Sequence, residues 1–188
     1  MINHIDLSSV LRRTVCDLYS DLVTRPTGAA VRDGIEKQLA ELGDPTLTVI
    51  DFSHVGLLDY SCADEIVAKL LIRYCSPLAG AAPPRNAYFL FRGVSDSHVD
   101  AIQAVLERHR LAIVAQTEDG AVVIIGNVAD SERRTWEAMR RLGRAAPTEL
   151  AREMGLDTVQ AEKALDALCQ RHLAMRFEEV YVAVGAAS

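Results

Sequence analysis

The residues best suited to chemistry lie in one stretch, Thr48 to Leu70, which reads TVIDFSHVGLLDYSCADEIVAKL. An apolar run ends there in Asp51, and a polar turn leads into a segment with helical spacing. The amide groups at the start of a helix favour anions and can hold a phosphate. We therefore predict a candidate binding loop that consists of Asp51, Ser53, His54, Asp59, Tyr60, Ser61, Asp64 and Glu65.

Ser61 allows two interpretations. A phosphate on its hydroxyl would add about two negative charges beside neighbouring carboxylates, and the repulsion could either eject an acidic partner or oppose the modification itself. Alternatively, Ser61 caps the helix while Asp64 and Glu65 favour its positive end. The sequence leaves both interpretations open.

The same carboxylates do not predict a metal centre or an active site. Adjacent helical positions point in different directions, so we expect Asp64 and Glu65 on different sides of their helix. His54 stands alone, and neither a metal-ligand spacing nor a nucleophile with its base is recognisable. We therefore predict no catalytic residue, no metal and no cofactor, and expect that the protein is not an enzyme.

The other reactive side chains have simple interpretations. We expect His98 and His109 to face solvent, because their helical segment is flanked by polar residues. For Cys62 we expect burial against the sheet, with a thiol sensor at the helix start as the alternative.

Apolar spacing predicts the elements that position this stretch. Helices are predicted over 7–24, from Val31 to Leu42, over 60–74 and over 95–109, with a Pro-, Gly- and Ala-rich loop over 76–84. Strands are predicted over 46–52, 87–91, 111–116 and 121–125, and Asp119–Gly120 favours a hairpin between the last two. The alternation indicates parallel crossovers in a mixed sheet with a final antiparallel pair.

The strand pattern stops near Asn127, which predicts an α/β domain over 1–130 and a smaller domain over 131–188. Helices are expected over 131–142, 147–154 and 158–172, followed by extended runs over 174–177 and 180–184. Three helices and a terminal hairpin are typical of a winged helix-turn-helix domain. The predicted fold class is α/β with this small domain at its carboxyl end.

Composition excludes some classes of protein. With 49% hydrophobic and 24% charged residues, neither a disordered chain nor a membrane protein is indicated. The first ten residues lack the basic start and apolar stretch of a secretory signal. The four cysteines, Cys16, Cys62, Cys75 and Cys169, form no CxxC pair, so we expect reduced thiols and a cytoplasmic location.

Charge differs between the two predicted domains. Residues 1–130 contain 11 Lys and Arg against 17 Asp and Glu, whereas residues 131–188 contain 9 of each. The first domain should therefore avoid nucleic acid. The second lacks the strongly basic balance that is typical of a DNA-binding module.

The stretch around Asp51 resembles the STAS family, the domain of anti-sigma-factor antagonists and sulphate transporters, in a divergent form. The similarity covers about residues 15–128, and its motifs are Leu22-Val23-Thr24-Arg25, Val49-Ile50-Asp51-Phe52-Ser53-His54-Val55 and Asp59-Tyr60-Ser61-Cys62-Ala63-Asp64-Glu65. The resemblance implies a partner-switching domain that docks on a kinase or other regulator, with the candidate binding loop as its partner-binding loop and Ser61 as phosphoacceptor. Tyr60 and Cys62 depart from the family pattern on either side of Ser61.

Residues 131–184 resemble the winged helix-turn-helix domains of bacterial regulators. The resemblance predicts a core of Leu150, Ala151, Leu156, Val159, Ala164, Leu165 and Leu168. A DNA-reading helix would present Asp157, Thr158, Gln160, Glu162 and Lys163, and the wing tip would be Glu178-Glu179. These are poor partners for phosphate.

The positive charge of this domain gathers on its first helix. Five arginines there form a possible face for nucleic acid or for an acidic partner, or a solvated surface: Arg133, Arg134, Arg140, Arg141 and Arg144.

We therefore expect a non-enzymatic bacterial-type regulatory protein that binds a kinase/ATPase-like or anti-sigma-like regulator through its STAS-like domain, with the winged helix as a second contact surface. The alternative is a DNA-binding transcription regulator whose STAS-like domain senses a signal or dimerises the protein. A homodimer through the first amphipathic helix remains open, and no membrane partner is expected.

Overall fold

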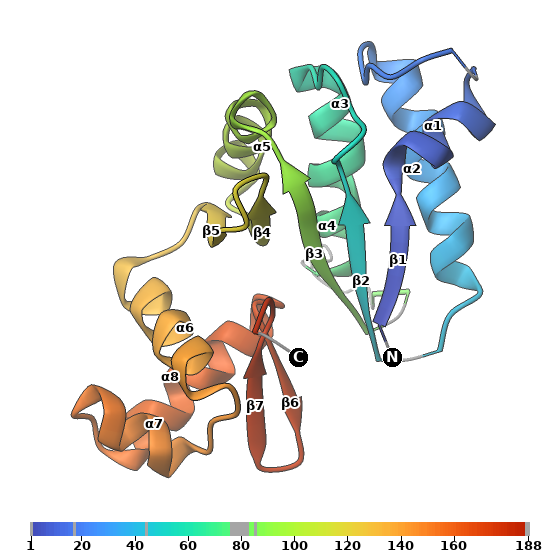
Figure 1. Cartoon of the computed structure of the whole chain (residues 1–188). Coiled ribbons are helices and arrows are strands. Elements are labelled where there is room, and N and C mark those ends of the chain that lie inside the picture. The colour runs from blue at the N-terminus through green and yellow to red at the C-terminus, as the bar shows by residue number, and fades with distance from the viewer. Residues whose placement is uncertain (1, 17, 44, 76–82, 85, 187–188) are drawn as a thin grey trace. The chain divides into compact units, whose positions relative to one another are not determined.

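A computed structural model describes residues 2–16, 18–43, 45–75, 83–84 and 86–186. The chain is an α/β protein that divides into two compact units, Met1–Asn127 and Val128–Ser188 (Figure 1). Each unit is described by itself below.

The first unit is built on a five-stranded mixed sheet in the order β1-β2-β3-β4-β5. The first four strands are parallel, and β5 runs antiparallel to β4, as the hairpin signal predicted. Their β-branched and aromatic residues suit a sheet. The strands are β1 (Ile2–Asp6), β2 (Thr46–Asp51), β3 (Ala87–Val94), β4 (Ala112–Thr117) and β5 (Val122–Gly126).

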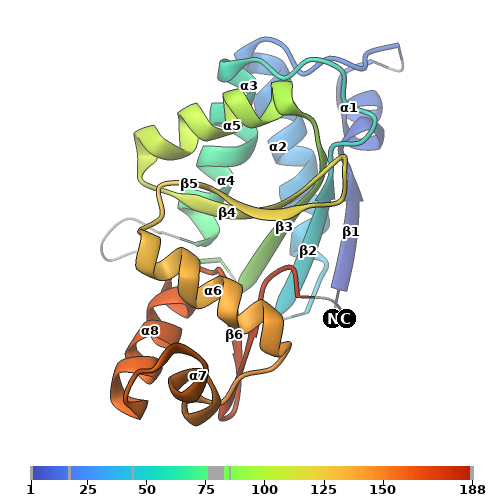
Figure 2. The same cartoon turned by 60° about the vertical axis from the view of Figure 1, so that its left-hand side comes forward.

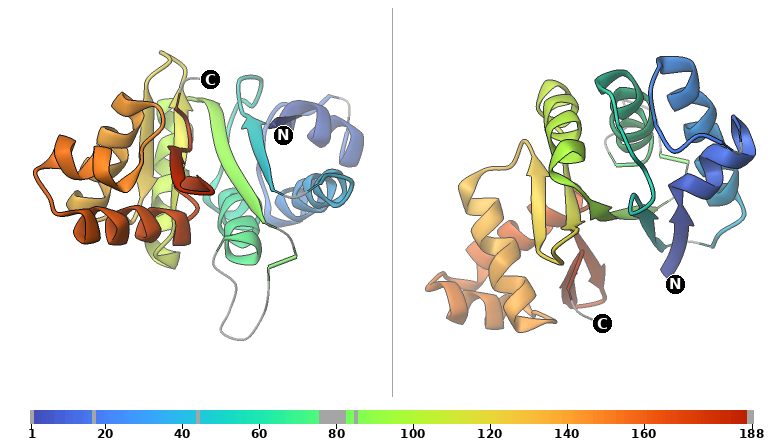
Figure 3. Two further views of the ribbon diagram at one scale, coloured as in Figure 1. Left: turned by 90° about the horizontal axis from the view of Figure 1, so that it is seen from below. Right: turned by 45° about the horizontal axis from the view of Figure 1, so that its top comes forward.

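The helices of this unit connect successive parallel strands, and α2, α4 and α5 lie along one face of the sheet (Figure 3). Right-handed crossovers between neighbouring parallel strands place their helices on the same side. The helices are α1 (Leu7–Thr14), α2 (Arg25–Ala40), α3 (Tyr60–Ala63), the π-helical turn η1 (Asp64–Ala68), α4 (Lys69–Tyr74) and α5 (Asp96–His109).

The first 25 residues differ from the prediction. The expected helix over 7–24 is only α1, which ends at Thr14 and follows a strand, β1, that the sequence did not reveal. Beyond it, residues 20–23 extend alongside residues 56–59, with a parallel bridge between Leu22 and Leu58. Backbone pairing with a distant segment is a tertiary contact that local periodicity does not report. The predicted loop over 76–84 falls largely on residues 76–82, outside the described residues.

The predicted helix over 60–74 is confirmed as three consecutive helical segments, α3, η1 and α4. It packs closely against α2 at Gly28, where an added Cβ would lie 2.9 Å from the Cα of Cys62 and 3.0 Å from the Cβ of Glu65. The absence of a side chain at Gly28 therefore allows the two helices to approach this closely.

The second unit contains three helices and a two-stranded antiparallel hairpin, which can be followed in Figure 2. Pro147 stands in the first turn of α7, and Gly155 ends that helix with φ 66°, a position that favours glycine. The predicted elements are confirmed as α6 (Asp130–Leu142), α7 (Pro147–Met154), α8 (Thr158–Gln170), β6 (Ala174–Phe177) and β7 (Val180–Ala183).

The core of this unit agrees only in part with the predicted one. Leu150, Leu165 and Leu168 are buried as expected. Val159 was expected in the core but is 60% exposed, while Ala161, two positions on, is fully buried. The helix therefore turns a slightly different face inward from the one that the motif predicted.

Candidate functional site

Asp59 is the centre of the turn between β2 and α3. Its carboxylate accepts hydrogen bonds from the Cys62 amide (2.7 Å) and the Ser61 hydroxyl (2.8 Å) on one oxygen, and from the Thr24 amide (3.0 Å) on the other. Burial alone would raise the pKa of Asp59, but these bonds outweigh it and hold the pKa below its ordinary value. Asp59, rather than Ser61, is thus the residue that caps α3.

Thr24 is the residue that Asp59 holds from outside the turn. Its backbone has φ 74° and ψ 140°, a conformation that costs a β-branched residue about 1–3 kcal/mol. The Thr24 carbonyl accepts a bond from the Cys62 thiol (2.9 Å), and its amide donates to Asp59. These long-range bonds fix the point at which the extended segment enters α2.

Asp64 and Glu65, which were predicted on different sides of their helix, are joined through one arginine. Both are buried, and one nitrogen of Arg25 donates to Asp64 at 2.9 Å and to Glu65 at 2.7 Å. Glu65 also accepts from Arg32 at 2.5 Å and from Lys69. The long side chain of Arg25 extends from α2, and its guanidinium group joins the two carboxylates.

This ion cluster affects the titration of both acids. Burial would raise the pKa of Glu65, but Lys69 and Arg25 outweigh that effect and lower it. Burial likewise opposes the lowering of the pKa of Asp64 by Arg25 and His109. Both side chains are therefore committed to intramolecular ion pairs and do not present free carboxylates to a partner.

The expectation that His98 and His109 face solvent is also wrong. His98 is 1% exposed, and its Nε2 lies 2.8 Å from the Gly56 carbonyl, so this nitrogen donates. Its Nδ1 accepts from the Ser95 amide at 3.3 Å. His109 Nε2 lies 2.9 Å from Asp64. Both histidines bind the β2–α3 region from α5, a tertiary role that flanking polar residues conceal.

The thiol of Cys62 is fully buried, as expected. Burial, followed by the charge of Asp59, raises the pKa of Cys62 to about 12. A thiol with such a pKa stays protonated near neutral pH, which argues against the redox-sensor alternative.

The earlier part of the predicted loop is more exposed. Asp51 accepts a bond from the Ser53 amide (2.9 Å) and pairs with Arg92 (3.0 Å), whereas the side chains of Ser53 and His54 are exposed. Burial opposes the bonds to Asp51, yet its pKa is lowered by Ser53 and Arg92. Only Ser53 and His54 of this group are open to a partner.

Five large apolar side chains, which the sequence analysis did not single out, are exposed on the two chain segments that meet at this turn, residues 18–23 and 57–60. The exposed fractions are 91% for Leu18, 55% for Tyr19, 39% for Val23, 60% for Leu57 and 39% for Tyr60. The two segments that carry them are hydrogen-bonded side by side through Leu22, Leu57 and Asp59. We call these five residues the apolar patch.

In the second unit, the five arginines of the predicted basic face have different surroundings. Arg141 pairs with Glu153 at 3.1 Å, and the Arg140 guanidinium lies 4.9 Å from the centre of the Trp136 ring. Arg133 is half-buried, whereas Arg134 and Arg144 are exposed. The face is therefore partly engaged by its own unit.

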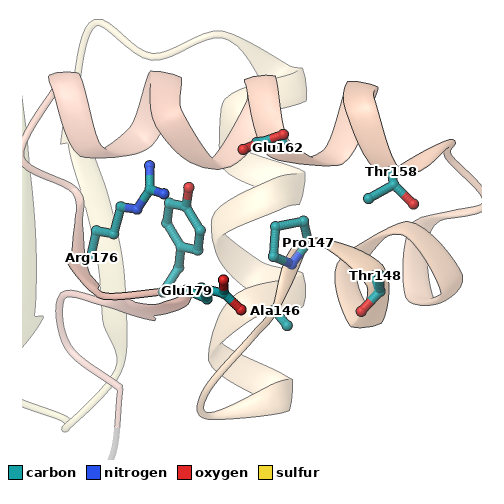
Figure 4. Close-up of a pocket in the computed structure, with 8 residues that line it drawn as sticks. Ala146, Pro147, Thr148, Thr158, Glu162, Arg176 and Glu179 are labelled. Carbon is teal, nitrogen blue, oxygen red and sulfur yellow. The ribbon is translucent and has the colours of Figure 1, made fainter.

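A groove of about 280 Å³ lies in the same unit (Figure 4). It is formed by the starts of α7 and α8 and by the β6–β7 hairpin. Its lining residues are Ala146, Pro147, Thr148, Thr158, Glu162, Arg176, Glu179 and Tyr181.

Comparisons with protein-family models, with curated proteins and with solved structures found no match to this chain. Within the described part of the chain, no three His, Cys, Asp or Glu side chains are grouped so that they could hold a metal ion. Across the same residues, no helix combines the length and apolar character needed to cross a membrane.

Proposed function

We propose that this chain is a non-enzymatic regulatory protein that binds another protein through its first unit, in the manner of partner-switching domains. The observation that supports this proposal is the apolar patch beside Ser61. Large apolar side chains that are exposed together on one surface mark interaction sites. The motif resemblance to STAS-like domains, at the same turn, agrees with this use.

Ser61 gives the patch a means of control. Its hydroxyl is half-buried and donates to the carboxylate of Asp59. A phosphate there would place about two negative charges against Asp59, which also holds Thr24. Repulsion would weaken that hold and alter the segment that carries Leu18, Tyr19 and Val23.

The proposed partner is a kinase/ATPase-like or anti-sigma-like regulator. An apolar centre with surrounding polar groups is the usual anatomy of a protein interface. The second unit, which we interpret as a winged helix, serves as a second contact surface in this proposal.

Affinity capture from a native bacterial lysate, read by mass spectrometry, tests the proposal. The intact chain is compared with Leu57→Asp and Ser61→Asp, which should each release the same regulator protein. The matched controls are Val123→Asp, an apolar residue exposed outside the patch, and Ser131→Asp, an exposed serine of α6. Equal recovery with all four variants would contradict the proposal.

The alternative function, a DNA-binding transcription regulator, is favoured by the exposure of Arg134 on α6 and of Arg144 just beyond its end. Binding through phosphates should weaken steeply with salt. A gel shift that is salt-sensitive and is lost in Arg134→Glu/Arg144→Glu supports this function. Absence of binding to genomic fragments at low salt removes it.

A further inference from the structure

The groove of the second unit is lined by apolar and charged residues together. Ala146 and Pro147 are its partly exposed apolar residues, and Figure 4 shows Glu162 and Glu179 on different sides of Pro147. Tyr181 is itself fixed at several points. Its amide and carbonyl both bond to Ala145 at 2.9 Å, and its hydroxyl donates to Asp166 at 2.9 Å. The groove is therefore preformed.

The lining residues include two acidic side chains and one basic side chain, which leaves the groove negative. Arg176 is held by Asp166 (3.5 Å), by the Glu178 carbonyl (2.9 Å) and over the Tyr181 ring (5.2 Å). Glu162 and Glu179 are exposed, and neither accepts a hydrogen bond or forms an ion pair with any described residue. The cation is thus already neutralised, and both carboxylates are available.

The size of the groove admits a single side chain. Its volume of about 280 Å³ lies at the lower end of the range of about 300–1,000 Å³ that is usual for small-molecule sites. A long basic side chain can lay its methylene groups on an apolar surface while its charged head reaches carboxylates. Ala146 and Pro147, which are partly exposed, provide the apolar surface, and the two glutamates provide the carboxylates.

We propose that this groove binds a basic segment of a partner protein by taking in the side chain of one arginine or lysine. The proposal assigns a ligand to the second contact surface of the proposed function. It rests on the proposed function only in that the second unit is taken to contact a protein. The exposed Val159 (60%) and Phe177 (45%), next in sequence to Thr158 and Arg176 of the lining, supply apolar contacts for the neighbours of the basic residue.

The same charges disfavour duplex DNA at this groove. Asp157 at the start of α8 and Glu178 at the hairpin tip are both exposed and add to the two glutamates. DNA phosphates would meet four carboxylates here, whereas a basic peptide finds charge complementarity.

A titration of the full-length, ¹⁵N-labelled chain tests the proposal. The probe is a blocked pentapeptide with arginine at its centre and leucines at its ends, and the matched probe carries citrulline, a neutral isostere, in place of arginine. We expect the arginine peptide to shift the amide signals of Thr158, Glu162 and Glu179 and to bind about tenfold more tightly than the citrulline peptide. Equal binding of both peptides, or no binding of the arginine peptide, overturns the proposal.

Two double variants separate this groove from general attraction to an acidic chain. Glu162→Gln/Glu179→Gln removes the groove charges, and Glu118→Gln/Glu137→Gln removes two exposed charges outside the groove. We expect only the first to lose the preference for arginine. The proposal fails if both variants weaken binding equally, or if the wild-type chain binds duplex DNA at this groove more tightly than it binds the arginine peptide.

The outcome can be distinguished from failure of the proposed function. Leu57→Asp disrupts the apolar patch and should leave the binding of the arginine peptide unchanged. If the wild-type chain does not bind the arginine peptide while Leu57→Asp still releases the regulator in the capture experiment, only the proposal for the groove is overturned.

Discussion

The two units use acidic side chains in opposite ways. In the first unit, Asp59 before α3 and Asp64 and Glu65 in η1 are each surrounded by donors of their own unit. In the groove of the second unit, Glu162 and Glu179 are exposed and form no such bond with the described residues. The first group maintains the fold, whereas the second is available for recognition. Before an acidic residue at a turn or helix start is assigned to binding, the hydrogen-bond donors that surround it in its own unit must therefore be identified.

The largest expected difference between the two groups is in stability. Glu65→Ala leaves Arg32, whose side chain is 20% exposed, without its closest carboxylate. Breaking a buried pair costs about 3–5 kcal/mol, and the exposure of Arg25 and Lys69 reduces our expectation to about 3 kcal/mol. Glu162→Ala, also on a helix, should change the free energy of unfolding by less than about 0.5 kcal/mol.

Urea denaturation of both variants measures this difference. Equal free energies of unfolding for Glu65→Ala and Glu162→Ala would show that the ion cluster does not stabilise the first unit. Because the chain has two units, the fluorescence of Trp136 follows the second unit and serves as an internal control.

The close approach of α2 to α3 gives a second, smaller expected effect. Gly28→Ala places a Cβ 2.9 Å from backbone, and we expect a loss of about 2 kcal/mol from overpacking. Gly34→Ala, in the same helix, meets only the side-chain tips of Val10 and Thr14, which can shift. Thermal unfolding should show Gly28→Ala melting well below Gly34→Ala, and the reverse order would exclude tight packing at Gly28.

The third prediction concerns pH. The pKa of Asp59 is lowered from 3.8 in the folded chain, so its contribution is present above that pH and is lost as the pH falls below it. Asp59→Asn keeps a capping oxygen for Cys62 but loses the second acceptor for Thr24. We expect a cost of about 1 kcal/mol at pH 7 that shrinks at pH 3.

Free energies of unfolding at both pH values test this sign. The control is Glu179→Gln, whose cost should be close to zero at either pH. A cost of Asp59→Asn that grows on acidification would contradict the assigned role of the ionised carboxylate.

The smallest expected effect is at Thr24. Glycine relieves the strain at φ 74°. It also adds freedom to the unfolded chain by about 0.5–1 kcal/mol and loses the hydrogen bond between the hydroxyls of Thr24 and Thr27 (3.1 Å), so Thr24→Gly should be nearly neutral. Thr27→Gly, in the first turn of α2, gains no relief and should cost about 1 kcal/mol. Chemical denaturation that finds Thr24→Gly as costly as Thr27→Gly would show that the strain is absent.

Much of the fold could be predicted because its signals are local. The run TLTVIDF, the Asp119–Gly120 turn and the helical spacing over 60–74 each correspond to an observed element. β1 was missed because Ile2–Asp6 alternates too weakly and gains its stability from pairing with β2. Residues 20–23 were assigned to a helix because Leu22 fits helical spacing equally well.

The candidate site was predicted in position but not in composition. Asp59 and Ser61 stand where the turn and helix start were expected, yet the two arginines that pair with Asp64 and Glu65, Arg25 and Arg32, come from α2, 33 or more residues earlier. Sequence neighbours alone cannot report such donors. The apolar patch carried a signal in Leu57, a large apolar residue in a turn, which helical and strand patterns leave unexplained.

The attachment of Tyr181 to Ala145 and Asp166 also bears on the time course of binding. Because this side of the groove is already fixed, we expect a basic peptide to enter in one step, without a slow rearrangement before or after the encounter. Association should then accelerate as the salt concentration falls, and the residence time should depend on how quickly one side chain withdraws. The partner's basic side chain would then bind and dissociate rapidly, which suits a second, auxiliary contact with the partner.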